Sequence, residues 1–158
     1  MHQNFYLREV TMQDITILFD WTNDPVTRRN SFQTAPVLWE EHVMWLNRKL
    51  NDENCFFYIL TDGEKNYGTI RLDYKEEDNS ALISFSVDAT HRGQGMGNYL
   101  LALAEKKAME ISTGKIAIKT LVGEVKIENL ASSKCFEKNG YLLKAEENGE
   151  YIFTKNII

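Results

Sequence analysis

Three consecutive segments between residues 55 and 87 constrain the fold more than any other feature of the chain. Each has the two-residue period and the β-branched and aromatic residues typical of a strand: "CFFYILT" (55–61), "NYGTIRLDY" (66–74) and "SALISFSV" (80–87). Only "DGEK" and the acidic "KEEDN" separate them. Because short turns of this kind join antiparallel neighbours, the region is predicted to form an antiparallel meander.

The N-terminal part adds a strand and two helices. Residues 5–10 form a predicted strand, and Thr11 is a predicted N-cap for a helix that "NDP" at 23–25 ends. A loop over residues 26–36 leads to a second helix over about residues 38–51. Apolar residues at spacings of four, three and four predict the inward face of that helix: Trp39, Val43, Leu46 and Leu50.

The C-terminal part continues with alternating elements. A helix is predicted to follow a glycine-rich segment and to run to about Ile111. "TLVGEV" (120–125) is a predicted strand, "NLASSKCFEKN" (129–139) a short helix, and residues 140–155 a hairpin around "EENG". No linker, repeat or low-complexity segment divides the chain, so residues 1–158 are predicted to form a single α/β domain.

Composition narrows the class of protein. A hydrophobic fraction of 43% and a charged fraction of 26% are typical of a globular protein that buries a core. The net charge of −5, with no basic cluster to offset it, argues against a nucleic-acid partner. Cys55 and Cys135 have neither zinc-ligand nor CxxC spacing, so we expect no metal.

The N-terminal residues and the two cysteines indicate a compartment. "MHQNFYLREV" lacks the basic start and apolar core of a signal peptide. No apolar run approaches the roughly 18 residues that a membrane span needs. Two free cysteines fit a reducing environment. We therefore expect a cytoplasmic protein without a membrane partner.

A glycine-rich segment, "RGQGMG" (92–97), lies between the third predicted strand of the meander and a long helix. The first N–H groups of a helix are unpaired and carry a partial positive charge, and glycines let the backbone approach a ligand. No acidic residue lies between Ala89 and Ala104 to repel an anion. This segment is therefore a candidate pyrophosphate loop. A tight helix start without any ligand remains the alternative.

Two better-known phosphate loops do not fit. "GMGNYL" lacks the Gly-Lys-Ser/Thr end of a Walker motif, and the dinucleotide pattern GxGxxG requires glycine where Asn98 stands. Instead, the segment 92–97 resembles the R-x-x-G-x-G acyl-CoA signature of the GNAT superfamily of N-acetyltransferases. "EVKIENLASSKCFEKNGY" (124–141) resembles that superfamily's C-terminal block, through five residues: Asn129, Ser132, Phe136, Gly140 and Tyr141.

The resemblance implies a fold and a co-substrate. The fold is a mixed, mostly antiparallel central sheet, splayed between strands four and five and flanked by helices. The co-substrate is acetyl-CoA, with no metal. Its pyrophosphate is expected on backbone N–H groups of seven residues: Arg92, Gly93, Gln94, Gly95, Met96, Gly97 and Asn98. Its pantetheine is expected along Ser86, Val87 and Asp88, with Asn129 and Ser132 holding the other side.

Two residues are expected at the reacting atoms. A backbone N–H near Val87 would stabilise the oxyanion that forms from the thioester carbonyl. Phe136 stands where the superfamily often has a tyrosine proposed to protonate the departing thiolate. Because phenylalanine has no proton to give, Phe136 is expected to pack against the acyl chain instead.

The resemblance to the superfamily also implies that the acceptor binds the first two helices and their loop, the segment 18–46, which is dense in aromatic and polar residues. The segment resembles the W-x-N-D…R…E-H-x-x-W region of bacterial acetyltransferases that act on nucleotide-linked amino sugars, as in pseudaminic-acid-type pathways. Related segments occur in ribosomal-protein and polyamine acetyltransferases. The predicted substrate-binding residues are Trp21, Asn23, Arg28, Ser31, Phe32, His42 and Trp45. Alternatively, the tryptophans belong to the core and "NDP" is only a helix stop.

Together these features predict direct transfer of acetyl from acetyl-CoA to a primary amine in a ternary complex. His42 is the first candidate for the base, with Glu124 and Asp73 next. The favoured partner is a small-molecule amine, namely a nucleotide-linked amino sugar. The protein is expected to be a monomer or homodimer. A protein N-terminus or a polyamine is the alternative acceptor. A non-catalytic acyl-CoA sensor is the alternative from another class, since Phe136 replaces the usual acid.

Overall fold

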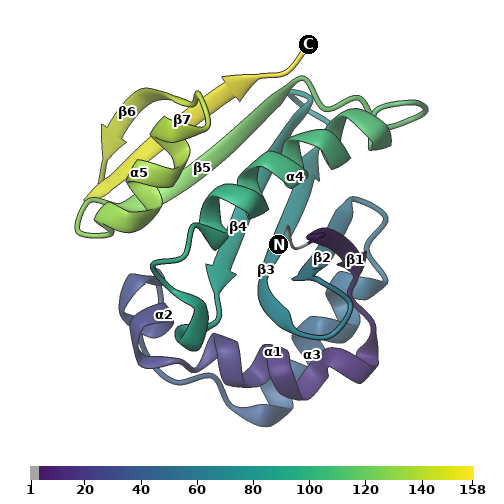
Figure 1. The fold of residues 1–158 in the computed structure, drawn as a ribbon. Helices are drawn as coiled ribbons and strands as arrows, with labels where there is room; N and C mark the ends of the chain where they lie inside the picture. Colours follow the sequence, from purple (N-terminus) through teal and green to yellow (C-terminus); the bar gives the residue numbers. More distant parts are fainter. Residues whose placement is uncertain (1–3) are drawn as a thin grey trace.

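The computed structural model describes residues 4–158 and shows one seven-stranded sheet in the order β1-β2-β3-β4-β5-β7-β6 (Figure 1). β4 and β5 are parallel, and every other neighbouring pair is antiparallel. The predicted meander and the splayed mixed sheet are confirmed. The strands are β1 (Tyr6–Glu9), β2 (Cys55–Thr61), β3 (Asn66–Lys75), β4 (Ser80–Val87), β5 (Thr120–Lys126), β6 (Leu142–Glu147) and β7 (Glu150–Asn156).

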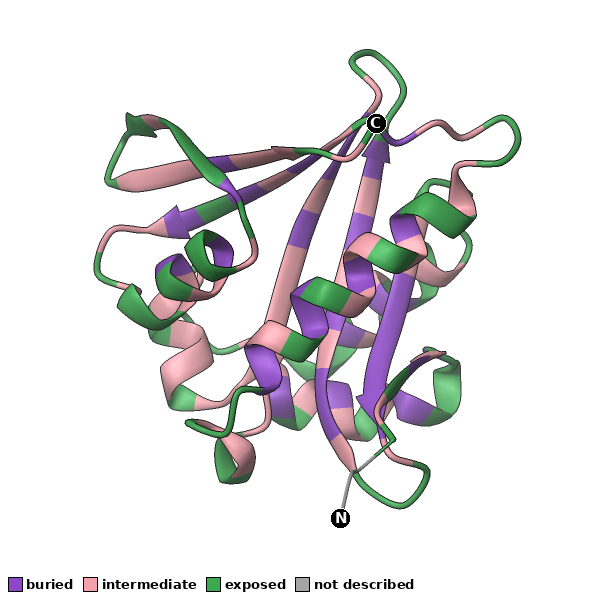
Figure 2. Cartoon of the chain, turned by 45° about the horizontal axis from the view of Figure 1, so that its top comes forward, coloured by how far each residue is buried: buried purple, intermediate pink, exposed green. Residues whose placement is uncertain are grey.

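Helices cover both faces of the sheet. One group contains α1 (Ile15–Thr22), α2 (Pro25–Asn30) and α3 (Trp39–Leu50), and the other contains α4 (Met96–Ile111) and α5 (Leu130–Lys138). Their buried faces turn towards the strands (Figure 2). Each group has its own apolar cluster: Leu18, Trp21, Leu46, Phe57 and Ile59 under α1 and α3, and a larger cluster under α4 and α5. The sheet therefore separates two cores.

β4 and β5 pair over only half of β4. Ser80–Ile83 pairs with Thr120–Gly123, and beyond these residues the two strands have no register. Gly123, the last β5 residue paired with β4, lies against the ring of Phe136, and a Cβ atom at position 123 would be 2.3 Å from that ring. The ring packs on Phe85, the second β4 residue beyond the paired stretch, with centroids 5.6 Å apart. These aromatic rings fill one side of the opening between the strands.

Two predicted features of the N-terminal half were wrong. The expected loop 26–36 contains α2, because Asp24 accepts hydrogen bonds from Val26 N and Thr27 N while Pro25 occupies the first helical position. The expected inward face of α3 is also displaced. Trp39 is 41% exposed, whereas His42 and Leu46 are the buried residues of that helix.

We predict that Gly123→Ala destabilises the protein by about 1–3 kcal/mol, because the new methyl group overlaps the Phe136 ring. Chemical denaturation measures the change. Gly114→Ala is the control, since a Cβ atom there meets nothing within 4 Å. Adding Phe136→Leu to Gly123→Ala should cost less than the sum of the two single changes. Strict additivity would contradict the proposed contact.

Candidate functional site

The open ends of β4 and β5 lead into a cleft of about 720 Å³. One wall comes from the sheet and α5, and the other comes from α1, α2, α3 and the segment after α2. Of the residues predicted from sequence, the cleft brings together Ser86 and Glu124 on the strands with Asn129, Ser132 and Phe136 beyond β5. It also brings in six of the seven predicted acceptor residues: Trp21, Arg28, Ser31, Phe32, His42 and Trp45.

The three glycines of the 92–97 segment are required for different reasons. Gly93 and Gly95 have positive φ angles of 75° and 81°, with nothing within 4 Å of an added Cβ atom. Gly97 is needed for space, because a Cβ atom there would be 2.8 Å from Cys135 Sγ on α5. Gly95 is the N-cap of α4 and provides no side-chain cap. The first N–H groups of α4 are thus left for an external acceptor.

The Val87 N–H has the direction expected of an oxyanion donor. The next residue, Asp88, donates its N–H to Tyr67 O on β3 at 2.8 Å. Successive N–H groups of a strand point alternately to its two sides, so the Val87 N–H points away from β3 and towards the gap before β5. β5 does not pair with this part of β4, and the Val87 N–H faces the opening.

Two side-chain contacts tie the glycine-rich segment and the residue after β4 to the start of α2 and to α1. Arg92 Nη2 donates to Asp24 Oδ2 at 2.6 Å, and Trp21 Nε1 donates to Asp88 Oδ1 at 2.7 Å. Burial would raise the pKa of Asp24, but the hydrogen bond from Arg92 and the N–H groups at the start of α2 hold it below its usual value. The Arg92 and Trp21 side chains thus act as braces between the two walls.

The predicted roles of Arg28 and Asn23 need correction. Arg28 donates from Nε to Thr22 O at 2.7 Å and from Nη1 to Gln33 O at 2.9 Å, and its Nη2 reaches Ser31 Oγ at 3.2 Å. Asn23 exchanges two hydrogen bonds with the backbone of Val37. These hydrogen bonds lie within the segment 22–37, so both residues hold the wall in place and Arg28 has few donors left for a substrate.

The surroundings of His42 favour a structural role, and its predicted role as the base stays a prediction. It is 1% exposed, and its Nε2 lies 3.1 Å from Ile15 O. A carbonyl only accepts, so Nε2 carries the proton, and Nδ1 is the ring nitrogen that could take another. Burial lowers the pKa of His42, which the hydrogen bond to Ile15 partly offsets. The ring stacks on Trp45 with centroids 5.8 Å apart, and we assign His42 to positioning Trp45.

Glu124 is the carboxylate that the cleft offers in its place. It follows Gly123, the last β5 residue paired with β4, and its side chain is exposed in the cleft. Across the opening, Asn129 and Ser132 form one polar unit: Asn129 Oδ1 accepts from Ser132 N, and Asn129 Nδ2 donates to Ser132 Oγ at 3.0 Å. Their predicted contact with pantetheine stays a prediction.

Phe136 is 2% exposed and packs face to face on Phe153, with centroids 5.6 Å apart. It also contacts Tyr141 edge to face. The Tyr141 hydroxyl is buried and has no hydrogen-bond partner among the described residues, and Tyr141 does not line the cleft. No tyrosine belongs to the cleft lining that the described residues form.

Arg71 of β3 is a cleft residue that the sequence reasoning did not single out. Its Nε donates to Asp73 Oδ2 at 2.8 Å, and its guanidinium lies 5.2 Å from the Trp45 ring centroid. The strand alternation contains the relevant signal: Ile70 and Leu72 are fully buried on the α4 side, so Arg71 faces α3. A charged residue at that position has to lie beneath α3.

The acetyltransferase (GNAT) domain model matches residues 4–142. The chain belongs to this family. As a GNAT protein it is an acyl-CoA-dependent acetyltransferase. Among the described residues no helix has the length and apolar character to cross a membrane. The same residues contain no group of three or more His, Cys, Asp or Glu side chains arranged to hold a metal.

Solved structures share the GNAT fold at low sequence identity. Spermidine N-acetyltransferase from Vibrio cholerae, in complex with CoA and spermine, is 15% identical with a TM-score of 0.82 over 97% of this chain and 94% of that one. An aminoglycoside acetyltransferase in complex with coenzyme A is 16% identical with a TM-score of 0.78, over 97% and 95%. RimL, a ribosomal α-N-protein acetyltransferase, is 15% identical with a TM-score of 0.79, over 98% and 95%. No curated protein matches significantly.

We predict that Gly95→Ala lowers CoA affinity at least about tenfold, because an alanine in the left-handed region costs roughly 1–2 kcal/mol and reorients the first N–H groups of α4. Isothermal titration with CoA measures it. Gly149→Ala is a matched control, since Gly149 has a φ of 79° and open space around it but lies in the β6–β7 turn. Equal loss of CoA affinity in both variants would contradict the assignment.

Proposed function

We propose that this acetyltransferase transfers the acetyl group of acetyl-CoA directly to a primary amine of a small acceptor, within a ternary complex. One observation carries the proposal. The Val87 N–H and the Glu124 carboxylate face the same opening between β4 and β5, and Glu124 lines the cleft that extends under α3. The arrangement leaves room for a thioester and an amine side by side.

The reaction needs one bond formed and one broken. The amine nitrogen attacks the thioester carbonyl, the Val87 N–H stabilises the oxyanion, and the C–S bond then breaks as the C–N bond is completed. Glu124 accepts the proton of the amine, directly or through one water. Phe136 supplies no proton to the leaving thiolate. With a thiol pKa of about 8.5 by analogy with cysteine, that thiolate is a fair leaving group and takes its proton from solvent.

The residues that line the cleft support a nucleotide-linked amino sugar as the acceptor. Phe32, Trp45 and Phe57 offer aromatic surface on which a sugar or base can stack. The polyamine alternative is less favoured, because the cleft lining holds three arginines (Arg28, Arg48 and Arg71) against two glutamates (Glu41 and Glu124). The solved neighbours are named for a polyamine, an aminoglycoside and a ribosomal protein, so the acceptor has to be argued from this chain.

Free-thiol release from acetyl-CoA, with amino sugars, polyamines and short peptides as acceptors, tests the proposal. We expect release that depends on an amino sugar. Release with peptides or polyamines alone would overturn the acceptor class. A rise in melting temperature with acetyl-CoA but no release with any amine would favour the sensor, which Phe136 keeps open.

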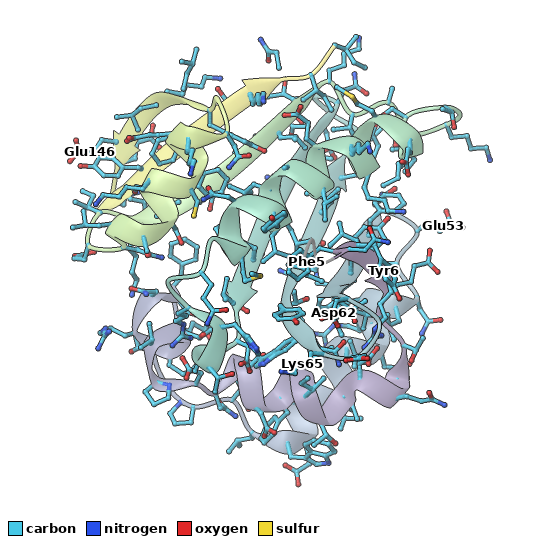
Figure 3. All side chains as sticks on the ribbon, viewed as in Figure 1. Phe5, Tyr6, Glu53, Asp62, Lys65 and Glu146 are labelled. Atoms are coloured by element: carbon cyan, nitrogen blue, oxygen red, sulfur yellow. The ribbon has the colours of Figure 1, made fainter. Side chains whose placement is uncertain are left out.

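We predict that Glu124→Gln lowers kcat about 100-fold or more at neutral pH, because positioned proton transfer contributes about 10²–10⁴-fold. The KM for acetyl-CoA should stay unchanged. Steady-state thiol release measures both. Glu146→Gln is the control, since Glu146 lies on β6 at the outer edge of the sheet (Figure 3).

His42→Gln keeps a donor for the Ile15 carbonyl and should leave the pH dependence of kcat in place. Loss of that dependence would return the role of base to His42.

A further inference from the structure

Arg71 lies on the β3 wall of the cleft in a geometry suited to an anion. We propose that Arg71 binds a carboxylate or phosphate group of the acceptor, so that the substrate is an amine that also carries a negative charge. The inference rests on the proposed function, since it concerns the acceptor pocket of the same cleft.

A chain of ion pairs through Asp73 and Lys49 holds the Arg71 side chain in place at its Nε atom. Its Nε donates to Asp73 Oδ2 at 2.8 Å, and Asp73 Oδ1 accepts from Lys49 Nζ on α3 at 3.0 Å. Burial would raise the pKa of Asp73, but Arg71 and Lys49 keep it below its usual value, so the carboxyl is charged. Two cations share one anion, so the group of Arg71, Asp73 and Lys49 keeps a net positive charge.

The outer edge of the guanidinium remains available to a ligand. Its Nη2 makes only a long 3.4 Å contact with Ser84 Oγ, and no hydrogen bond to a described residue engages Nη1. The plane is held over Trp45 and Phe57, whose ring centroids lie 5.2 and 5.6 Å away. Because the two terminal nitrogens of arginine form a planar fork, this edge matches the two oxygens of a carboxylate or phosphate.

The register places Arg71 opposite Glu124 across the opening. Arg71 pairs with Ser84 on β4, and Ile83 pairs with Gly123 on β5, so Arg71, Ser84 and Glu124 share the face that turns towards α3. Two strand spacings separate β3 from β5, or roughly 10 Å between backbones. The cleft therefore presents the Arg71 guanidinium on one side and the Glu124 carboxylate on the other. This pair of charges is complementary to a single molecule that carries both an anionic group and an amine.

The other charges of the cleft lining do not provide this complement. Arg28 has its donors engaged by backbone carbonyls and by Ser31. Glu41 and Arg48 belong to α3, and both are exposed. Of the three arginines in the lining, Arg71 is the one fixed in place with an unengaged edge.

Matched acceptor pairs test the proposal: glucosamine phosphate against glucosamine, and γ-aminobutyrate against butylamine. Binding is measured as thermal shift in the presence of CoA, and turnover as thiol release from acetyl-CoA. In the wild type we expect kcat/KM to favour the anionic member of at least one pair. Arg71→Gln should reduce that preference about 10- to 100-fold through KM, with the KM for acetyl-CoA unchanged. Arg71→Lys should recover part of it.

Arg8→Gln is the control, because Arg8 also forms a two-bond pair, with Asp14, and lies outside the cleft. It should keep the preference for the anionic member. Equal use of both members in the wild type, or an undiminished preference in Arg71→Gln, would overturn the proposal while acetyl transfer stands. Thermal shifts that need Arg71, without thiol release from any amine, would support anion binding and overturn the proposed transfer.

Discussion

The contact between Phe136 and Gly123 is the one on which the rest of the site depends. A seven-stranded sheet pairs its neighbours wherever it can, because each unpaired backbone N–H or C=O inside a protein is costly. Here β4 and β5 separate after Ile83 and Gly123, at the point where the Phe136 ring lies against the glycine. Beyond that point the Val87 N–H on β4 faces the opening, and the Glu124 side chain on β5 faces the cleft.

The two walls of the cleft are braced against each other by few polar contacts. Arg92 reaches Asp24 at the start of α2, and Trp21 reaches Asp88 at the end of β4. The first contact joins the start of α2 to the glycine-rich segment, and the second joins α1 to the residue that follows β4. The position of α2 is thus linked to that of the glycine-rich segment.

The fold and the loop before α4 could be predicted from the sequence. Strand alternation and short turns identified the meander, and the spacing of "RGQGMG" identified the loop before α4. The acceptor side was harder to predict, because the partners of Arg28 and His42 are backbone carbonyls that no side-chain pattern reveals. The sequence shows Arg71 only as a charged residue in an alternating strand. Its place in the cleft could not be predicted, because it depends on α3 packing over that strand.

Hydrogen exchange of the protein with and without CoA tests the central claim most directly, because it reads backbone amides without assuming an acceptor. CoA seated in the opening between β4 and β5 should slow exchange at Val87 and in the segment 92–98, with smaller effects around 124–136. The β6–β7 hairpin should be unaffected. Protection spread evenly over the chain, or confined to regions away from β4 and α4, would contradict the account.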